Sequence, residues 1–295
     1  MARRRRTPAW VEVPRQDGRR VVVTGATSGI GLQAARILAA FGAEVVLAVR
    51  NTDKGAAVAR DLSGKVDVRR LDVADLASVR AFADEVGEVD VLVNNAGVMG
   101  VPFARTVDGF ETQIATNHLG HFALANLLLP RLTDRVVVVG SASHWAGELD
   151  VDDLGWERRE YHGYPAYAQS KLANLLFLAE LQRRLTAAGS TLRATGAHPG
   201  YTSTGIQLNT GNRAFTWLSN VGNALVGMPA WQGALCMVYA ATMDLPGNCY
   251  VGPSGPGEML GWPRLVGRSS DAGDPALARA LWDRSEQLTG VTFPL

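Results

Sequence analysis

Cysteine and long apolar runs are both scarce in this 295-residue chain. The two cysteines, Cys236 and Cys249, cannot build a disulfide framework, which favours a reducing compartment. Apolar runs such as Val136–Val139 are far too short to cross a bilayer. No apolar segment follows the basic run Arg3–Arg6, so the N-terminus is not a secretory signal. These absences predict a soluble, cytoplasmic protein with no stable membrane insertion.

Charge of one sign is also missing, since 29 basic residues face 28 acidic ones and the formal net charge is +1. This balance argues against nucleic acid as the main partner. The run Arg3–Arg6 would suit contact with RNA or an anionic membrane, but we interpret residues 1–16 as a solvated, disordered basic tail. No His/Cys cluster has metal-ligand spacing, so no metal is expected. Lysine occurs only at Lys54, Lys65 and Lys171, which directs attention to each of them.

The chain from residue 17 alternates β-branched apolar runs with stretches of helical spacing. The predicted strands are Arg20–Thr24, Ala43–Val49, Val66–Leu71, Val89–Val93, Arg135–Gly140 and Thr191–Ala197. Helices are predicted between them, for example over Ile30–Phe41 and Leu76–Val86, and again at Pro275–Leu288 near the end. Continuous valine-rich strands separated by helices are typical of a parallel sheet buried on both faces. The sequence therefore predicts one doubly wound α/β domain over residues 17–295.

The composition changes over residues 200–267, where Gly, Pro, Asn and Trp rise and strand-like runs become rare. In a doubly wound fold such a segment is a candidate for covering the substrate. Its apolar side chains would form a lipophilic lining, or else ordinary core or a dimer contact. These side chains are Phe215, Trp217, Leu218, Met228 and Trp231. Asn209–Arg213 has the composition of a mobile lid tip.

A glycine-rich turn follows the first predicted strand and opens the first predicted helix. Its glycines would allow a tight turn, a close backbone approach to a pyrophosphate, and close packing of helix on strand. The helix N-terminus would add free N–H groups and a positive dipole end. The predicted cofactor contacts in this turn are Gly25, Thr27, Ser28, Gly29, Ile30 and Gly31. The spacing is Gly-x-x-x-Gly-x-Gly.

The ends of the second and third predicted strands indicate how the nucleotide would be recognised. No acid stands at positions 48–51, and Arg50 would pair with the 2′-phosphate of NADP, so NADP(H) is favoured over NAD(H). The alternative is that Arg50 is an ordinary exposed arginine. Asp72 and Val73 end the third strand, where Asp72 would bond an adenine amino group or cap the following helix.

Tyr167 and Lys171 stand four residues apart at the start of a predicted helix and project from one face. Bringing a phenol from pKa about 10 to near 7 needs about 4 kcal/mol, which one ammonium about 4 Å away, helped by an oxidised nicotinamide ring, can supply. Such a tyrosine would exchange a proton while a nicotinamide exchanges a hydride. Ser141, with Ser143 as a competitor, follows the fifth strand, and Asn94, Ala96 and Gly97 end the fourth. Both positions lie at the ligand-binding edge of such a sheet.

Taken together, TGATSGIG, NNAG, a serine after strand five, YAQSK and the Pro-Gly at 199–200 resemble the short-chain dehydrogenase/reductase family in order. NNAGVM and TVDGFETQIATNHLGHF resemble the branch of retinol dehydrogenases and WW-domain-containing oxidoreductases. The resemblance implies a Rossmann-type fold with a mostly parallel, seven-stranded sheet flanked by helices. It also implies a homodimer or homotetramer.

The resemblance implies roles for individual residues. Tyr167 would be the general acid/base, Lys171 would lower its pKa and hold the nicotinamide ribose, and Ser141 would orient the substrate oxygen. Asn117 would anchor a water that links Lys171 to solvent. The other residues that would line the cofactor site are Asn94, Gly97, Pro199 and Thr202. The family assigns His118 and His121 no chemistry, so we interpret them as helix packing or surface. The insert from Trp145 to Tyr164 is expected to border the substrate pocket.

The function these observations predict is an NADP(H)-dependent oxidoreductase that interconverts a lipophilic alcohol and its aldehyde or ketone. One alternative is a sensor on the same fold that binds NADP(H) without turnover, although such a protein would be expected to lose the tyrosine or the lysine. Another alternative is a reductase of an activated C=C bond, which product analysis would distinguish.

Overall fold

The computed structural model describes residues 12–202 and 227–295 of the chain. The strands are β1 (Arg20–Thr24), β2 (Glu44–Val49), β3 (Lys65–Arg70), β4 (Val89–Asn94), β5 (Leu132–Val139), β6 (Arg193–Ala197), β7 (Tyr250–Pro253) and β8 (Pro263–Leu265). The longer helices are α1 (Gly29–Ala40), α2 (Thr52–Ala59), α3 (Leu76–Glu85), α5 (Gly120–Leu128), α6 (Gly163–Ala187), α8 (Ala230–Thr242) and α9 (Pro275–Thr289). Short helical turns include α4 (Thr112–Ile114), a π-helix η2 (Ala115–Leu119) and a 3₁₀ turn η4 (Ala142–Ala146).

The strands form one sheet in the order β3-β2-β1-β4-β5-β6-β7-β8. The pairs from β3 to β7 are parallel, and β8 runs antiparallel to β7. The strand order reverses between β1 and β4, which is where ligands bind in open α/β sheets. The predicted doubly wound, mostly parallel sheet is confirmed. Within the described residues the sheet has one strand more than the predicted seven, because the three-residue β8 adds an antiparallel edge.

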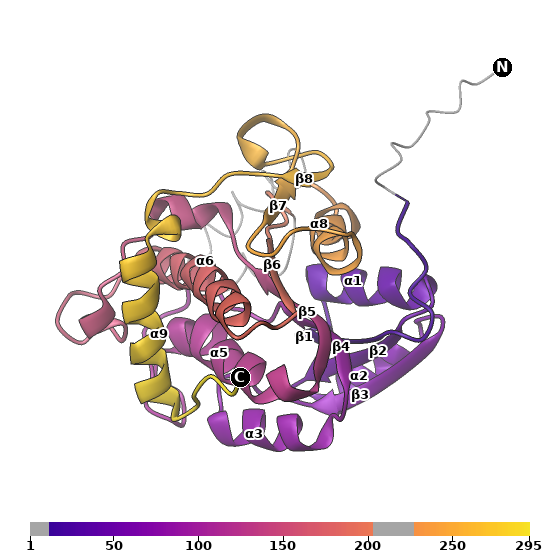
Figure 1. Ribbon diagram of the computed structural model, residues 1–295, viewed down its shortest axis with the longest axis horizontal. Coiled ribbons are helices and arrows are strands. Elements are labelled where there is room, and N and C mark those ends of the chain that lie inside the picture. The colour runs from indigo at the N-terminus through magenta and orange to yellow at the C-terminus, as the bar shows by residue number, and fades with distance from the viewer. Residues whose placement is uncertain (1–11, 203–226) are drawn as a thin grey trace.

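Helices cover both faces of the sheet (Figure 1), and successive residues of the buried strands belong to different core clusters. Val21 of β1 belongs to a core cluster shared with α1 and α8, whereas Val22 belongs to the cluster shared with α3, α5, α6 and α9. Each residue of β1 after Arg20 is buried, so both faces of this strand are covered. This two-sided burial explains why the strands read as continuous valine runs instead of alternating patterns.

Helix ends follow local capping chemistry. The carboxylate of Asp75 accepts hydrogen bonds from Ala77 and Ser78 N–H and so begins α3. α9 begins after Asp274, which caps it in the same way, and it ends at Gly290 in the left-handed conformation. The alternative that Asp72 caps α3 is therefore wrong, because Asp75 takes that position. Asp72 instead accepts from the N–H of Ala74 at 3.0 Å, closing a local turn.

Buried, hydrogen-bonded structure begins closer to the N-terminus than the sequence predicted. Residues 1–11 of the predicted basic tail lie outside the described residues. Gln16, within that predicted tail, is 2% exposed and donates its N–H to the Phe41 carbonyl at 2.8 Å. No helix within 12–202 and 227–295 is both long and apolar enough to cross a membrane. In the same ranges, no group of His, Cys, Asp and Glu side chains is arranged to hold a metal ion.

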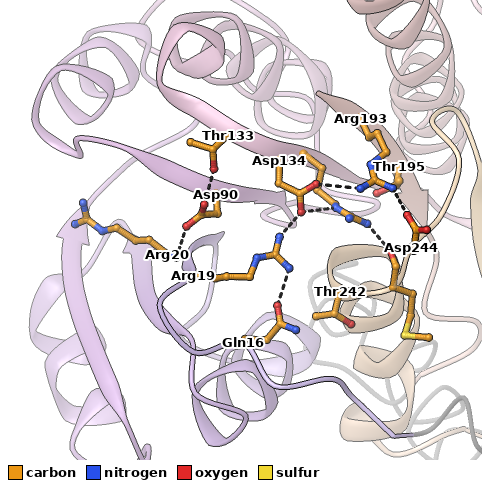
Figure 2. Close-up of polar contacts among 12 residues, drawn as sticks. Gln16, Arg19, Arg20, Asp90, Thr133, Asp134, Arg193, Thr195, Thr242 and Asp244 are labelled. Carbon is orange, nitrogen blue, oxygen red and sulfur yellow. Dashed lines mark hydrogen bonds and ion pairs between the residues drawn. The ribbon is translucent and has the colours of Figure 1, made fainter. Parts of the chain in front are cut away.

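A network of arginines and aspartates joins the N-terminal ends of β1, β5 and β6 (Figure 2). The Asp134 carboxylate of β5 pairs with Arg19, with Arg135 at 3.0 Å and with Arg193 at 3.6 Å. Arg135 is only 3% exposed, and its guanidinium also donates to the carbonyls of Ala240 and Met243. One carboxylate thus balances a buried cation and links three segments that are distant in sequence.

Asp134→Ala is expected to lower the free energy of unfolding by about 2 kcal/mol, measured by urea denaturation. Removing one partner of a buried pair costs about 3–5 kcal/mol, and the two carbonyls that Arg135 keeps reduce this loss. Asp244→Ala is the matched control, because Asp244 pairs with Arg193 while its side chain is 96% exposed. Equal losses in the two variants would contradict the assigned role of Asp134.

Candidate active site

The glycine-rich turn after β1 forms the floor of a cavity of 410 Å³, here called the loop cavity. It lies over the ends of β1, β2, β3 and β4, at the strand-order reversal. Most of the predicted cofactor residues line it, namely Gly25, Thr27, Ser28, Gly29, Ile30, Gly31, Arg50, Asp72, Val73, Ala96 and Gly97. Residues predicted from four separate segments of the sequence therefore meet around one space.

Two glycines of this turn are required by close approach to the end of β4. Gly25 has a φ of +68°, and a Cβ there would lie 2.9 Å from the Ala96 Cα. A Cβ on Gly31 would lie 2.3 Å from the Asn95 Nδ2. Both distances are too short for any larger residue without movement of the neighbouring chain. The glycine spacing therefore brings the turn against the Asn-Asn-Ala-Gly segment.

The N-terminus of α1 opens toward the loop cavity without a capping side chain. Ser28 occupies the N-cap position in an extended conformation and makes no side-chain hydrogen bond to the helix. The first N–H groups of α1 therefore keep their capacity to bind an anion, and the helix dipole favours a negative charge there. Ser28, Gly29, Ile30 and Gly31 all line the cavity at this point.

The two asparagines that end β4 have different surroundings. Asn94 is 2% exposed, lines neither cavity, and directs its Nδ2 toward the His121 carbonyl. Asn95 lines the loop cavity, and its Nδ2 donates to the Thr24 carbonyl at 2.7 Å. Neighbouring residues of a strand point to opposite sides, so only one of the pair reaches the site. Of this pair, Asn95 lines the loop cavity and the predicted Asn94 does not.

A second cavity of 660 Å³ adjoins the loop cavity and is here called the tyrosine cavity. The two share Ile30, Asn95, Gly97, Val98 and Met99 in their walls. The predicted residues that line the tyrosine cavity are Ser141, Tyr167, Lys171, Pro199 and Thr202. A ligand that fills the loop cavity therefore has its end beside the hydroxyl and ammonium groups of the second.

Helix α6 carries Tyr167 and Lys171 one turn apart, on the side that faces the end of β5. The Lys171 Nζ donates to the Val139 carbonyl at 3.1 Å and lies 5.7 Å from the centre of the Tyr167 ring. Burial lowers the pKa of Lys171 to about 8. The Ser141 hydroxyl begins η4, accepts from the N–H of Ser143 at 3.1 Å, and hydrogen-bonds the Tyr167 side chain.

The pKa of Tyr167 moves in the direction opposite to the predicted one. Burial raises it to about 12, and the hydrogen bond with Ser141 only partly offsets this. The sequence argument assumed that the Lys171 ammonium would face the phenol oxygen. In the structure the ammonium is directed at the Val139 carbonyl, and desolvation of the phenolate is the larger effect. Burial therefore favours the neutral phenol of Tyr167 over its phenolate.

Asn117 lies in the π-helix η2, behind the walls of both cavities. Its Oδ1 accepts from the Val98 N–H at 2.8 Å, and its Nδ2 donates to the Val98 carbonyl and to the Ser170 hydroxyl. The side chain therefore fixes the segment that follows Gly97. Both hydrogens of the Asn117 Nδ2 are used in these bonds, so this side chain has no further hydrogen to donate to the predicted water.

Several residues that contact or line the site were not predicted from the sequence. The His144 Nδ1 lies 2.6 Å from the Ser141 carbonyl, and its Nε2 accepts from the Ser269 N–H at 3.2 Å. Because Ser269 can only donate, Nδ1 carries the proton and donates to Ser141. The β7–β8 connection adds Gly257, Glu258 and Met259 to the wall of the tyrosine cavity. Residues 257–259 lie far from the family motifs in sequence.

The predicted substrate segment is only partly described. Phe215, Trp217, Leu218 and the predicted lid tip Asn209–Arg213 lie outside the described residues. Met228 is buried beneath the β7–β8 connection, and its sulfur accepts from the Gly261 N–H at 3.2 Å. Trp231 is 47% exposed and packs beside Trp262. Neither Met228 nor Trp231 lines the tyrosine cavity. From the predicted insert Trp145–Tyr164, Tyr164 lines the cavity.

The chain belongs to the short-chain dehydrogenase/reductase family, since the family model described as short chain dehydrogenase matches residues 19–213. It is therefore an oxidoreductase of CH–OH and C=O groups. The relatives place it in the retinol dehydrogenase branch. It is 39% identical to retinol dehydrogenase 13 of Homo sapiens, covering 97% of this chain and 88% of the relative.

Two further relatives cover nearly the whole chain. Polyprenol dehydrogenase of Mus musculus is 40% identical over 95% of this chain and 86% of its own length. A crystal structure of an uncharacterized protein from Mycobacterium paratuberculosis is 54% identical, with a TM-score of 0.86. That match covers 97% of this chain and 98% of the other.

Proposed function

We propose that this protein is an NADP(H)-dependent oxidoreductase that interconverts a lipophilic alcohol and its aldehyde or ketone. The observation that carries the proposal is the shared wall of the two cavities. Gly97 and Val98 separate the uncapped N-terminus of α1 from the cavity that holds Ser141, Tyr167 and Lys171. The proposal includes a cytoplasmic location and a homodimer or homotetramer, as predicted from the sequence.

The hydrogen-bonding groups that line the loop cavity support binding of a dinucleotide. The free N–H groups of α1 would hold the pyrophosphate, and Asp72 at the far wall would accept from the adenine amino group. Among residues 12–202 and 227–295, the buried Asn95 Oδ1 has no hydrogen-bond partner, which leaves one acceptor unused beside this wall. When bound, the nicotinamide supplies or takes up a hydride at the reacting carbon.

The side chains of the tyrosine cavity supply the proton chemistry. In carbonyl reduction the neutral Tyr167 hydroxyl donates its proton to the substrate oxygen as the carbon–oxygen double bond becomes a single bond. The Ser141 hydroxyl bonds the same oxygen and stabilises its developing charge. The Lys171 ammonium, four residues along α6, would hold the nicotinamide ribose and favour the phenolate that remains.

The walls of the tyrosine cavity support a lipophilic substrate. Val98, Met99 and Met259 contribute apolar surface, and the aromatic rings of Tyr164 and Tyr201 complete it. Two of the relatives are named for retinol and polyprenol, both of which are long lipophilic alcohols. We therefore expect long-chain or terpenoid-like aldehydes and ketones to react better than sugars or charged acids.

Arg50 supports the choice of NADP(H). It directly follows β2, is exposed, and lines the loop cavity, while Ala48, Val49 and Asn51 offer no carboxylate to a ribose hydroxyl. A guanidinium in this position would pair with the 2′-phosphate. Lys54 lines the same wall and adds a second positive charge.

Arg50→Ala is expected to raise the dissociation constant of NADPH about tenfold to hundredfold and that of NADH less than threefold. The reason is that a hydrogen bond to a charged group contributes about 1.5–3 kcal/mol, and only NADPH has the 2′-phosphate. Titration of nicotinamide fluorescence measures both constants. Arg60→Ala, at the exposed end of α2 and outside the cavity, is the control. Equal changes for the two nucleotides would reject the assignment of Arg50.

The function itself is tested by NADPH titration followed by turnover with a panel of lipophilic aldehydes, ketones and enones. NADPH-dependent reduction of a carbonyl, identified as the alcohol product, is the expected result. Tight NADPH binding without turnover across the panel would favour the sensor instead. Saturation of an enone double bond in place of its carbonyl would favour the C=C reductase.

A further inference from the structure

His121 lies between the loop cavity and Asn117, at the beginning of α5. It is 3% exposed, and both of its ring nitrogens are within hydrogen-bond distance of a partner. Nε2 lies 2.9 Å from the Thr24 hydroxyl at the end of β1, and Nδ1 lies 3.2 Å from the Asn117 carbonyl. The ring therefore connects the turn that precedes the glycine loop to the π-helix that carries Asn117.

The hydrogen bonds of Thr24 decide which ring nitrogen carries the proton. The Thr24 hydroxyl oxygen accepts from the N–H groups of Asn95 and Ala96 at 2.9 and 2.8 Å. Both lone pairs are then used, so the hydroxyl must donate its single hydrogen. Its better acceptor is the His121 Nε2 at 2.9 Å, since the Val93 carbonyl lies 3.4 Å away. Nδ1 consequently carries the ring proton and donates to Asn117.

This arrangement requires a neutral imidazole, and its surroundings favour one. Complete burial lowers the pKa of His121 to about 4, and the nearby positive charge of Lys171 acts in the same direction. A protonated ring would carry a hydrogen on Nε2, where Thr24 needs an acceptor. The chain of hydrogen bonds therefore has a fixed direction, from Thr24 to His121 to the Asn117 carbonyl.

Both ends of this chain touch the walls of the proposed site. Asn95 and Ala96 line the loop cavity, and the side chain of Asn117 holds Val98 on both of its backbone groups. A Cβ placed on Gly97 would lie 3.0 Å from the Asn117 Oδ1 and 3.8 Å from the Lys171 Nζ. Displacement of Asn117 would therefore move the wall that the two cavities share.

We propose that His121 is a positioning residue, whose neutral ring holds the Asn95–Ala96 backbone and the Asn117 carbonyl in register and so aligns the nucleotide with Lys171. The inference rests on the proposed function, because alignment matters only if a nucleotide binds beside Tyr167. It differs from the interpretation made from the sequence, in which His121 served helix packing or lay at the surface.

The neighbouring His118 provides a matched control. It is 1% exposed and lies one turn earlier, but its Nε2 faces the Ser285 hydroxyl of α9 at 2.9 Å. Its ring packs near Phe122 and Phe177, and it lines neither cavity. Loss of His118 should therefore affect folding stability without changing the alignment of the site.

The test compares His121→Leu, His121→Gln and His118→Leu by urea denaturation, NADPH titration and steady-state kinetics with a reactive aldehyde. We expect His121→Leu to raise the NADPH dissociation constant and to lower kcat, each about tenfold per folded molecule. His121→Gln should recover most of kcat, because its amide can donate to Asn117 and accept from Thr24. His118→Leu should lower the urea midpoint while both other values stay within twofold.

Equal NADPH affinity and kcat in His121→Leu and His118→Leu would overturn the proposal, as would a His121→Gln variant no better than His121→Leu. If His121→Leu does not fold, His121→Asn replaces it, since that amide is too short to span both partners. Equal kcat for His121→Asn and His121→Gln would then overturn it. Absence of NADPH binding by the unchanged protein would instead reject the proposed function itself.

Discussion

Tyr167→Phe is expected to lower turnover about a thousandfold while NADPH affinity stays within about twofold, because general acid catalysis contributes about 10²–10⁴ in rate. The substitution removes only the hydroxyl, whose partner in the structure is Ser141. The ring itself, 9% exposed and packed in α6, would remain in place. Nucleotide titration and turnover measured on the same preparation separate binding from chemistry.

Tyr164→Phe is the control for this experiment. Tyr164 lies three residues earlier in α6, also lines the tyrosine cavity, and donates its hydroxyl to Ser143 at 3.3 Å. Its side chain is 54% exposed, so removal of its hydroxyl should change kcat by less than about threefold. Retained turnover in Tyr167→Phe, or an equal loss in Tyr164→Phe, would reject Tyr167 as the proton donor.

Acidification from pH 7 to pH 5.5 is expected to lower the free energy of unfolding by about 3–4 kcal/mol. Burial lowers the pKa of three histidines far below the ordinary value, to about 3 for His118 and to about 4 for His121 and His198. In the unfolded chain each would have a pKa of about 6.5. Below that pH the unfolded state binds protons that the folded state does not, so stability falls as the pH falls toward 4.

Urea denaturation at the two pH values measures this loss. His118→Leu should be less stable at pH 7, yet it should lose about 1 kcal/mol less on acidification because one of the three titrating groups is gone. If the variant and the unchanged protein lose the same free energy of unfolding on acidification, His118 does not contribute to the pH dependence. The same variant serves as the stability control for His121.

The parts of the site that the sequence predicted depend on contacts within one segment. The turn from Gly25 to Gly31 joins a strand to a helix, and its function follows from that local geometry. Tyr167 and Lys171 lie one helical turn apart, so their common face is fixed by α6 itself. Ser141 at the end of β5 required only the assumption of a parallel sheet. The structure places these residues around the two cavities, because their local geometry depends little on tertiary packing.

The features that the sequence analysis missed depend on contacts between segments. Asn94 and Asn95 are equivalent in a motif, and only the pleat of β4 decides which one reaches the loop cavity. The direction of the Tyr167 pKa depends on where the Lys171 ammonium points, and Val139 on a different strand determines that. The contacts of His121 join β1 to η2, two segments about 90 positions apart, so no local pattern could predict them.

The β7–β8 connection has a consequence for how this family member could change its substrate during evolution. It reaches the tyrosine cavity through Glu258 and Met259, while a pair of strands holds its base and the His198 ring holds Glu258 at 3.0 Å. The motif residues of the chemistry lie on other strands and on α6. In the proposed site, exchanges within residues 254–262 would alter the wall that faces the substrate without changing Ser141, Tyr167 or Lys171.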